Sequence, residues 1–225
     1  MAQESLLDAI EIEPPGGAAT HAVFWLHGLG DTGHGHVDVV RSLALSRDAR
    51  VRFILPHAPE IPVTVNFGMV MPAWYDVESL EGERHDLDGV RRSARRLEAL
   101  VARETRRGIA SERIVLAGFS QGGVVALHLA LRHGARLLAA IGLSTYMIGA
   151  ETLDAEASPA NARLPVFMAH GTRDPMVPLR GARAARDVLC ARGHDVTWRE
   201  YPMQHEVSLE EIEDVGAWLS ERLRG

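Results

Sequence analysis

The chain of 225 residues contains no lysine, and all 24 of its basic residues are arginine. This absence excludes chemistry that needs a lysine amine, such as a Schiff base, a serine–lysine dyad or the lysine of a phosphate-binding P-loop. Cysteine is almost as scarce. Cys190 has no partner in the chain for a disulfide, and it lies in the helix-like segment Ala182–Ala191. We expect it to be a small buried hydrophobic residue and not a nucleophile.

The sequence also has no apolar run long enough to span a membrane and no block of like charge. Residues 1–8 lack the basic and apolar regions of a signal peptide. The formal net charge of −6 is spread along the chain and provides no basic stripe for nucleic acid. We therefore expect a cytoplasmic protein that neither binds nucleic acid nor inserts stably into a membrane.

Apolar strand-like runs alternate with helical patterns along the whole chain. The predicted strands are 6–12 at an edge, 22–26, 51–55, 114–117, 137–143, 165–169 and 196–201. The predicted helices are 37–45, 87–107, a helix directly after Ser120, 180–192 and 209–223, and two irregular loops cover 58–83 and 144–164. This alternation predicts one α/β domain over 1–225, with a mostly parallel central sheet and helices on both faces.

One stretch carries the strongest chemical signal: Gly118-Phe119-Ser120-Gln121-Gly122, between a strand and a helix. A turn this tight brings the two backbones close together, so glycine is needed on either side of the serine. The serine hydroxyl would face a cleft, next to the free N–H groups at the start of the helix. By itself the motif is weak, since an ordinary glycine-rich turn with a bystander serine has the same pattern.

A second glycine motif, Gly28-x-Gly30-x-x-Gly33, favours a competing function, because it matches the dinucleotide-binding fingerprint. That function requires a carboxylate at the end of the next strand to hold the ribose, and Pro56-His57 stands there instead. In an α/β-hydrolase the same loop supplies one N–H of the oxyanion hole, and the residue after the nucleophile supplies the other.

A serine nucleophile requires a histidine to accept its proton and a carboxylate to orient that histidine. Asp174 follows one late strand and His205 follows the next, so both should lie at the strand ends beside Ser120. Other candidates fit this placement less well. They are His128 and His133 on the helix after the serine, His194 before its strand, and Asp154 and Glu156 in an irregular loop.

The run His34-x-His36-x-Asp38 resembles part of a dinuclear metal site. It lacks the further histidine that would complete such a run, and the chain has no cysteine cluster. We interpret it as a polar loop that enters a helix, and we predict that the protein needs neither a metal nor a cofactor.

Six motifs together resemble the phospholipase/carboxylesterase family, which includes bacterial carboxylesterases and acyl-protein thioesterases. They are 26–33 (LHGLGDTG), 71–76 (MPAWYD), 118–123 (GFSQGG), 143–146 (LSTY), 170–177 (HGTRDPMV) and 203–206 (MQHE). The resemblance extends over nearly the whole chain in register. It implies an α/β-hydrolase fold without a large cap domain, and hydrolysis of carboxylic esters or thioesters.

The resemblance also implies roles for individual residues. Ser120, Asp174 and His205 correspond to the catalytic triad, and the backbone N–H groups of Leu29 and Gln121 correspond to the oxyanion hole. The residues expected to border the substrate are Trp74, Thr145, Tyr146, Met147, Met176 and Val177. The chain differs from the family pattern at Gln204, where glycine is usual, and at Met147-Ile148, where proline is common.

From these features we predict a serine esterase that acts through an acyl-enzyme on Ser120, with a small-molecule ester as substrate. A shallow apolar groove formed by the two irregular loops predicts short- to medium-chain acyl groups. Acyl-protein thioesterase or lysophospholipase activity is the main alternative, and the protein could form a homodimer. An inactive binding module on the same scaffold and a dienelactone-hydrolase-like enzyme fit less well. The first would not need the complete set of catalytic groups, and the second typically uses cysteine.

Overall fold

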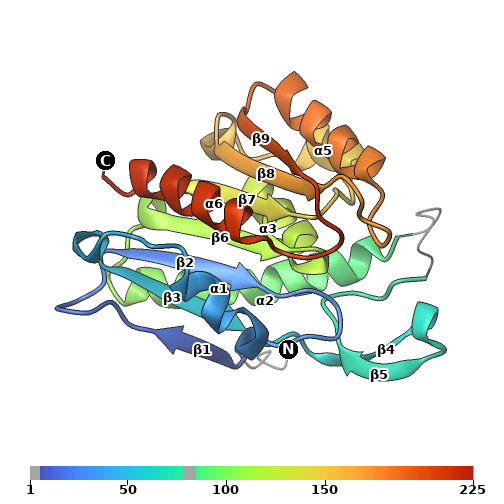
Figure 1. Cartoon of the computed structure of the whole chain (residues 1–225), viewed down its shortest axis with the longest axis horizontal. Helices are drawn as coiled ribbons and strands as arrows, with labels where there is room; N and C mark the ends of the chain where they lie inside the picture. The colour runs from blue at the N-terminus through green and yellow to red at the C-terminus, as the bar shows by residue number, and fades with distance from the viewer. Residues whose placement is uncertain (1–5, 79–84, 225) are drawn as a thin grey trace.

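A seven-stranded sheet forms the centre of the computed structural model, which describes residues 6–78 and 85–224 (Figure 1). The strand order is β1-β3-β2-β6-β7-β8-β9. The strands are β1 Ala9–Ile12, β2 His21–Leu26, β3 Val51–Pro56, β6 Ile114–Phe119, β7 Ala139–Leu143, β8 Pro165–Gly171 and β9 Asp195–Tyr201. All neighbours are parallel except β1, which pairs antiparallel with β3 at the edge. The loops that follow the parallel strands therefore gather at one end of the sheet.

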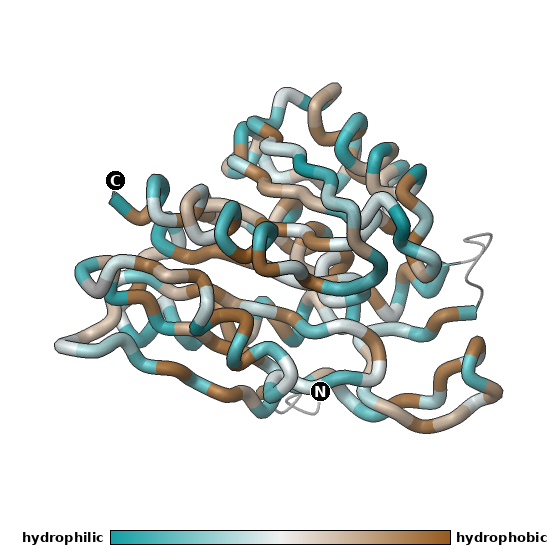
Figure 2. The backbone as a smooth tube through the Cα atoms, in the orientation of Figure 1, coloured by the Kyte–Doolittle hydropathy of each residue, from teal (hydrophilic) through white to brown (hydrophobic). Residues whose placement is uncertain are grey.

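Helices cover both faces of the sheet, as the sequence predicts. On one face the core includes α2 Leu87–Arg106, α3 Gln121–Arg132 and α5 Leu179–Ala191. On the other face it includes α1 Val37–Arg41 and α6 Leu209–Arg222. Every residue of β2 is buried, because a strand in the middle of a covered sheet has no solvent-facing side. Figure 2 shows this as hydrophobic colour along the central strands, whereas the outer helices alternate in colour.

The structure corrects the prediction that 58–83 is irregular. The segment contains a two-stranded antiparallel hairpin, β4 Glu60–Val63 and β5 Met69–Pro72, which projects from the molecule (Figure 1). Its turn is made by Phe67 and Gly68, both with positive φ (58° and 77°). Prolines at strand positions 62 and 72 hid this hairpin in the sequence, but an isolated ribbon has two edges where they are tolerated. Residues 79–84 of the predicted loop lie outside the described residues.

Three further expectations differ from the structure in detail. The helix predicted over 37–45 ends at Arg41, and Ala44 has a φ of 49°, which no right-handed helix accommodates. The loop 144–164 contains the short helix α4 Leu153–Glu156. Cys190 is exposed. The buried face of α5 runs through Ala182, Ala185 and Leu189. Cys190 follows Leu189, so its side chain is rotated by about 100° around the helix axis, toward solvent.

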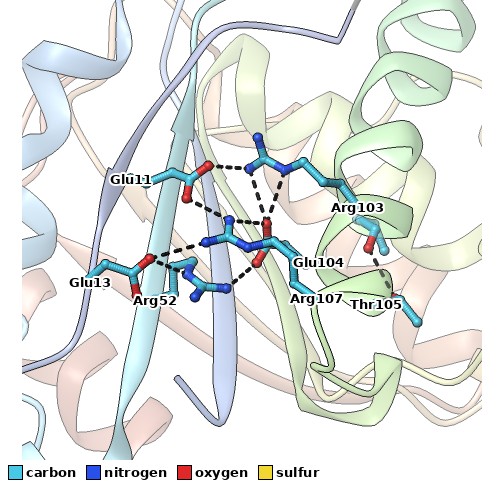
Figure 3. A network of polar contacts seen from close by, with 8 residues as sticks. Glu11, Glu13, Arg52, Arg103, Glu104, Thr105 and Arg107 are labelled. Carbon is cyan, nitrogen blue, oxygen red and sulfur yellow. Dashed lines mark hydrogen bonds and ion pairs between the residues drawn. The ribbon is translucent and has the colours of Figure 1, made fainter. Parts of the chain in front are cut away.

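An ion network with a buried centre attaches the edge strand β1 to α2 (Figure 3). Its centre is Glu104, which is fully buried and lies 2.6 Å from Arg52, 2.9 Å from Arg107 and 3.1 Å from Arg103. These guanidinium groups also pair with Glu11 of β1 and with Glu13. Three carboxylates thus balance three guanidinium groups, so no charge is left uncompensated at this site.

Among the described residues, none of the helices combines the length and apolar character needed to cross a membrane.

Candidate active site

Ser120 lies at a strained turn between β6 and α3. Its backbone has φ 53° and ψ −121°, a region that residues with a side chain rarely adopt. The turn depends on the flanking glycines. A Cβ on Gly118 would lie 2.4 Å from the carbonyl group of Gly122, and a Cβ on Gly122 would lie 2.5 Å from the carbonyl oxygens of Leu26 and His27. The predicted strand–turn–helix around the serine is therefore present, for the steric reason that the sequence suggested.

The structure brings Ser120, His205 and Asp174 together from the ends of three strands. His205 Nε2 lies 2.9 Å from Ser120 Oγ, and His205 Nδ1 lies 2.7 Å from Asp174 Oδ2. The carboxylate accepts the Nδ1 proton, which leaves Nε2 free to accept a proton from the serine hydroxyl. Asp174 Oδ1 also accepts the backbone N–H groups of Met176 and Val177, at 2.8 and 2.9 Å, so the carboxylate is held in place.

A second histidine, which the sequence analysis did not single out, contacts the same carboxylate. His170 is fully buried at the end of β8, and its Nε2 donates to the carbonyl oxygen of Val177 at 2.9 Å and lies 3.4 Å from Asp174 Oδ2. Burial lowers the pKa of His170, so the ring is neutral and adds no positive charge beside Asp174. The signal in the sequence is the pair His170-Gly171 at the end of an apolar strand.

The family difference at Gln204 has a simple structural outcome. Gln204 is not among the described non-glycine residues with positive φ, so its side chain introduces no strain before His205. The glycine that this region requires is Gly171, where a Cβ would lie 2.3 Å from the carbonyl oxygen of Gln204 and 2.5 Å from that of Met203. The close approach of β8 to the histidine loop therefore depends on Gly171 and not on the residue before His205.

A cavity of about 610 Å³ opens at Ser120. Most of its wall is apolar, and it includes Val77, Tyr146 and, from α5, Ala184 and Val188. Four of the six predicted substrate-contacting residues line it: Tyr146, Met147, Met176 and Val177. Its size lies within the range of about 300–1,000 Å³ that is typical of small-molecule sites.

Leu29 and Gln121 line the same cavity. Gln121 is the first residue of α3, where a backbone N–H has no partner within the helix. Within the described ranges, neither the Leu29 N–H nor the Gln121 N–H takes part in a hydrogen bond. Both groups are thus free to bind an oxygen atom of a molecule in the cavity.

Trp74 and Thr145, the other two predicted substrate-contacting residues, do not line the cavity. They are 2% and 1% exposed because they lie beneath the site and support it. Thr145 Oγ1 donates to the backbone carbonyl of Ser120 at 2.7 Å. Both residues therefore lie in the layer behind the cavity wall, and the sequence motif did not distinguish that layer from the wall itself.

Other candidate residues for catalysis or metal binding have environments that differ from that of the triad. Burial lowers the pKa of His128 to about 4, so it stays neutral inside α3. Hydrogen bonds from Thr152 and Arg132 lower the pKa of the Glu156 carboxyl to about 2, and Asp154 pairs with Arg192 at 2.6 Å. His36 accepts a hydrogen bond from Trp25 at 3.0 Å. In the part of the chain that the structure describes, no three histidine, cysteine or acidic side chains are placed to hold a metal ion.

A mostly parallel sheet with helices on both faces and a serine at a strained strand–helix turn define the α/β-hydrolase class. Comparison with known proteins extends this assignment. The family model described as phospholipase/carboxylesterase matches residues 7–223. The chain belongs to this family, and it is a hydrolase that acts on esters.

Relatives and solved structures agree with this family. The chain is 39% identical over 220 residues to acyl-protein thioesterase 1 of Gibberella zeae, covering 93% of this chain and 94% of the relative. It is 40% identical over 215 residues to the protein of the same name in Neurospora crassa, covering 91% and 87%. The crystal structure of Zea mays acyl-protein thioesterase 2 superimposes with a TM-score of 0.83 at 30% identity, covering 96% of this chain and 99% of that chain.

Proposed function

We propose that Ser120, His205 and Asp174 form the catalytic triad of a carboxylic ester hydrolase that works through an acyl-enzyme. The observation that carries this proposal is the continuous pair of contacts Ser120 Oγ–His205 Nε2 (2.9 Å) and His205 Nδ1–Asp174 Oδ2 (2.7 Å). A serine hydroxyl is a poor nucleophile at neutral pH, and this arrangement supplies both the base and the group that orients it.

The geometry supports the following sequence of steps. His205 removes the Ser120 proton while Oγ attacks the ester carbonyl carbon. The carbonyl oxygen becomes an oxyanion that accepts hydrogen bonds from the N–H groups of Leu29 and Gln121. The imidazolium then gives its proton to the leaving alcohol or thiol as the bond to the acyl group breaks. Water, activated by the same histidine, cleaves the acyl-enzyme and releases the carboxylic acid.

The apolar cavity favours a substrate whose acyl chain is of short to medium length and binds inside it. Apolar side chains such as Val77 and Val188 line its wall, and an acyl chain that leaves water to contact them is stabilised by the hydrophobic effect. The relatives named acyl-protein thioesterase indicate that a thioester is a second candidate substrate. The same triad serves both reactions, since only the leaving atom differs.

The test compares Ser120→Ala with Ser144→Ala. Ser144 is a matched control because it is also buried at a strand end and also has positive φ (44°), yet its hydroxyl has no hydrogen-bond partner among the described residues. We expect Ser120→Ala to lose nearly all hydrolysis of p-nitrophenyl esters and all labelling by a fluorophosphonate, while Ser144→Ala keeps both. Unchanged ester hydrolysis by Ser120→Ala would refute the assignment. Ester and thioester series of matched acyl length then identify the preferred leaving atom and chain length.

A further inference from the structure

Trp74 makes hydrogen bonds to both segments that carry the proposed oxyanion-hole donors, the loop that begins at His27 and the start of α3, although it lies outside the cavity. Its indole Nε1 donates to the backbone carbonyl of His27 at 2.8 Å, and its backbone N–H donates to the side-chain oxygen of Gln121 at 2.7 Å. Its own carbonyl accepts a short hydrogen bond from the Ser93 hydroxyl of α2. Trp74 is 2% exposed, so these bonds are shielded from water.

The first half of the hole is connected to Trp74 through His27. The Ala58 N–H donates to His27 Nε2 at 3.0 Å, so the ring proton must be on Nδ1. His27 Nδ1 then donates to the carbonyl oxygen of Gly28 at 2.7 Å. The peptide bond between Gly28 and Leu29 is trans, so its C=O and its N–H point in opposite directions. Holding the Gly28 oxygen on the His27 side therefore turns the Leu29 N–H to the other side of the loop.

One further contact and the charge state of the ring keep His27 in this arrangement. The His27 and Trp74 rings are packed together, with centroids 5.2 Å apart. Burial lowers the pKa of His27 to about 4, so the neutral tautomer persists at ordinary pH and the bond to Gly28 is not disturbed by ionisation.

The second half of the hole is connected to Trp74 through the Gln121 side chain. Both ends of this amide are used: Oε1 accepts from the Trp74 N–H, and Nε2 donates to the Tyr75 carbonyl at 2.6 Å. These bonds hold Gln121 at the start of α3, where the residue lines the cavity. The adjacent Pro72 carbonyl accepts the Gly30 N–H at 2.8 Å, which ties the same segment to the Leu29 loop.

We propose that Trp74 is a positioning residue that sets the distance and orientation between the Leu29 and Gln121 N–H groups by bonding to His27 and Gln121 at once. The proposal rests on the proposed function, because it assigns Trp74 a task in the same site. Loss of one oxyanion-hole donor typically reduces the rate by about 10²–10³. Removal of a supporting bond misplaces a donor without deleting it, so we expect kcat to fall by roughly 10–100-fold.

The experiment uses Trp74→Phe, which keeps an aromatic ring against His27 but removes the indole N–H. Trp218→Phe is the matched control. Trp218 is also buried and also donates its indole N–H, to Thr197 at 2.9 Å, but it lies on α6 in the core of the opposite sheet face. Gln121→Met is the second variant, because it keeps the backbone N–H and removes both side-chain bonds to the Trp74 segment. Thermal unfolding confirms that each variant is folded before kinetics are measured.

We expect Trp74→Phe and Gln121→Met to lower kcat at least tenfold with little change in KM, because the lost interaction is made in the transition state. Affinity for a trifluoromethyl ketone, whose adduct carries an oxyanion, should fall with kcat, whereas affinity for the unreactive ether analogue should not. A kcat equal to that of Trp218→Phe, or a change confined to KM, would overturn the proposal. Ester hydrolysis that survives in Ser120→Ala would instead overturn the proposed function, so the two failures are distinguishable.

Discussion

Glu211 makes the stability of this protein depend on pH in an unusual direction. The residue lies in the first turn of α6, where its N–H donates to the Ser208 hydroxyl at 3.2 Å. Its side chain is fully buried, and neither carboxyl oxygen has a hydrogen-bond partner within the described part of the chain. Burial raises the pKa of this carboxyl from 4.5 to about 8, because the charged form would lose its hydration, and the nearby Ser208 backbone N–H offsets only part of that loss.

The size and sign of the effect follow from proton linkage. Between pH 4.5 and about 8 the folded protein keeps this proton, whereas the unfolded chain releases it. The folded state therefore binds more protons, and the free energy of unfolding falls as the pH rises through this range. A shift of about 3.5 pKa units, from 4.5 to 8, corresponds to at most about 5 kcal/mol at 1.36 kcal/mol per unit. Above pH 8 this contribution stays constant.

The assay is urea unfolding at closely spaced pH values from 5 to 9, for the unmodified protein and for Glu211→Gln. Glutamine has nearly the same shape as glutamate and carries no charge. In the Glu211→Gln variant, position 211 therefore makes no contribution to a fall in stability over this pH range. We expect the free energy of unfolding of Glu211→Gln, relative to that of the unmodified protein, to rise by several kcal/mol between pH 5 and pH 8. Glu210→Gln, at the exposed neighbouring position, is the control and should follow the unmodified protein. Parallel curves for Glu211→Gln and the unmodified protein would refute the reasoning.

Three further changes have definite expected outcomes. Gly122→Ala places a methyl group 2.5 Å from two backbone carbonyl oxygens, so the melting temperature should fall by several degrees and most ester hydrolysis should be lost; normal values for both would contradict the steric argument. Glu104→Leu removes the centre of the ion network and should cost about 3 kcal/mol in urea unfolding, and a neutral result would show that its arginine partners rehydrate freely. Ala184→Phe fills part of the cavity wall on α5 and should shift the preferred p-nitrophenyl ester to shorter acyl chains, with kcat on the acetate ester unchanged.

Much of the fold and the core of the site could be predicted because their signals are local. Covered parallel strands require continuous apolar runs, so 22–26 and 165–169 are visible without any partner. The turn at Ser120 has a steric demand that only its flanking glycines satisfy. The placement of Asp174 and His205 after successive parallel strands follows from one topological rule, that such loops share one end of a sheet.

Other features depend on contacts between distant segments, and no local pattern reports them. Trp74 stands in a motif that suggests a substrate contact, but the approach of the Pro72–Tyr75 segment to Gln121 turns its side chain into the layer behind the cavity. The charge state of Glu211 likewise depends on what covers α6, which its position in an acidic first turn does not reveal. Sequence periodicity shows which residues are buried. The hydrogen-bond partners and the ionisation state of a buried residue depend on which other groups surround it in the folded protein.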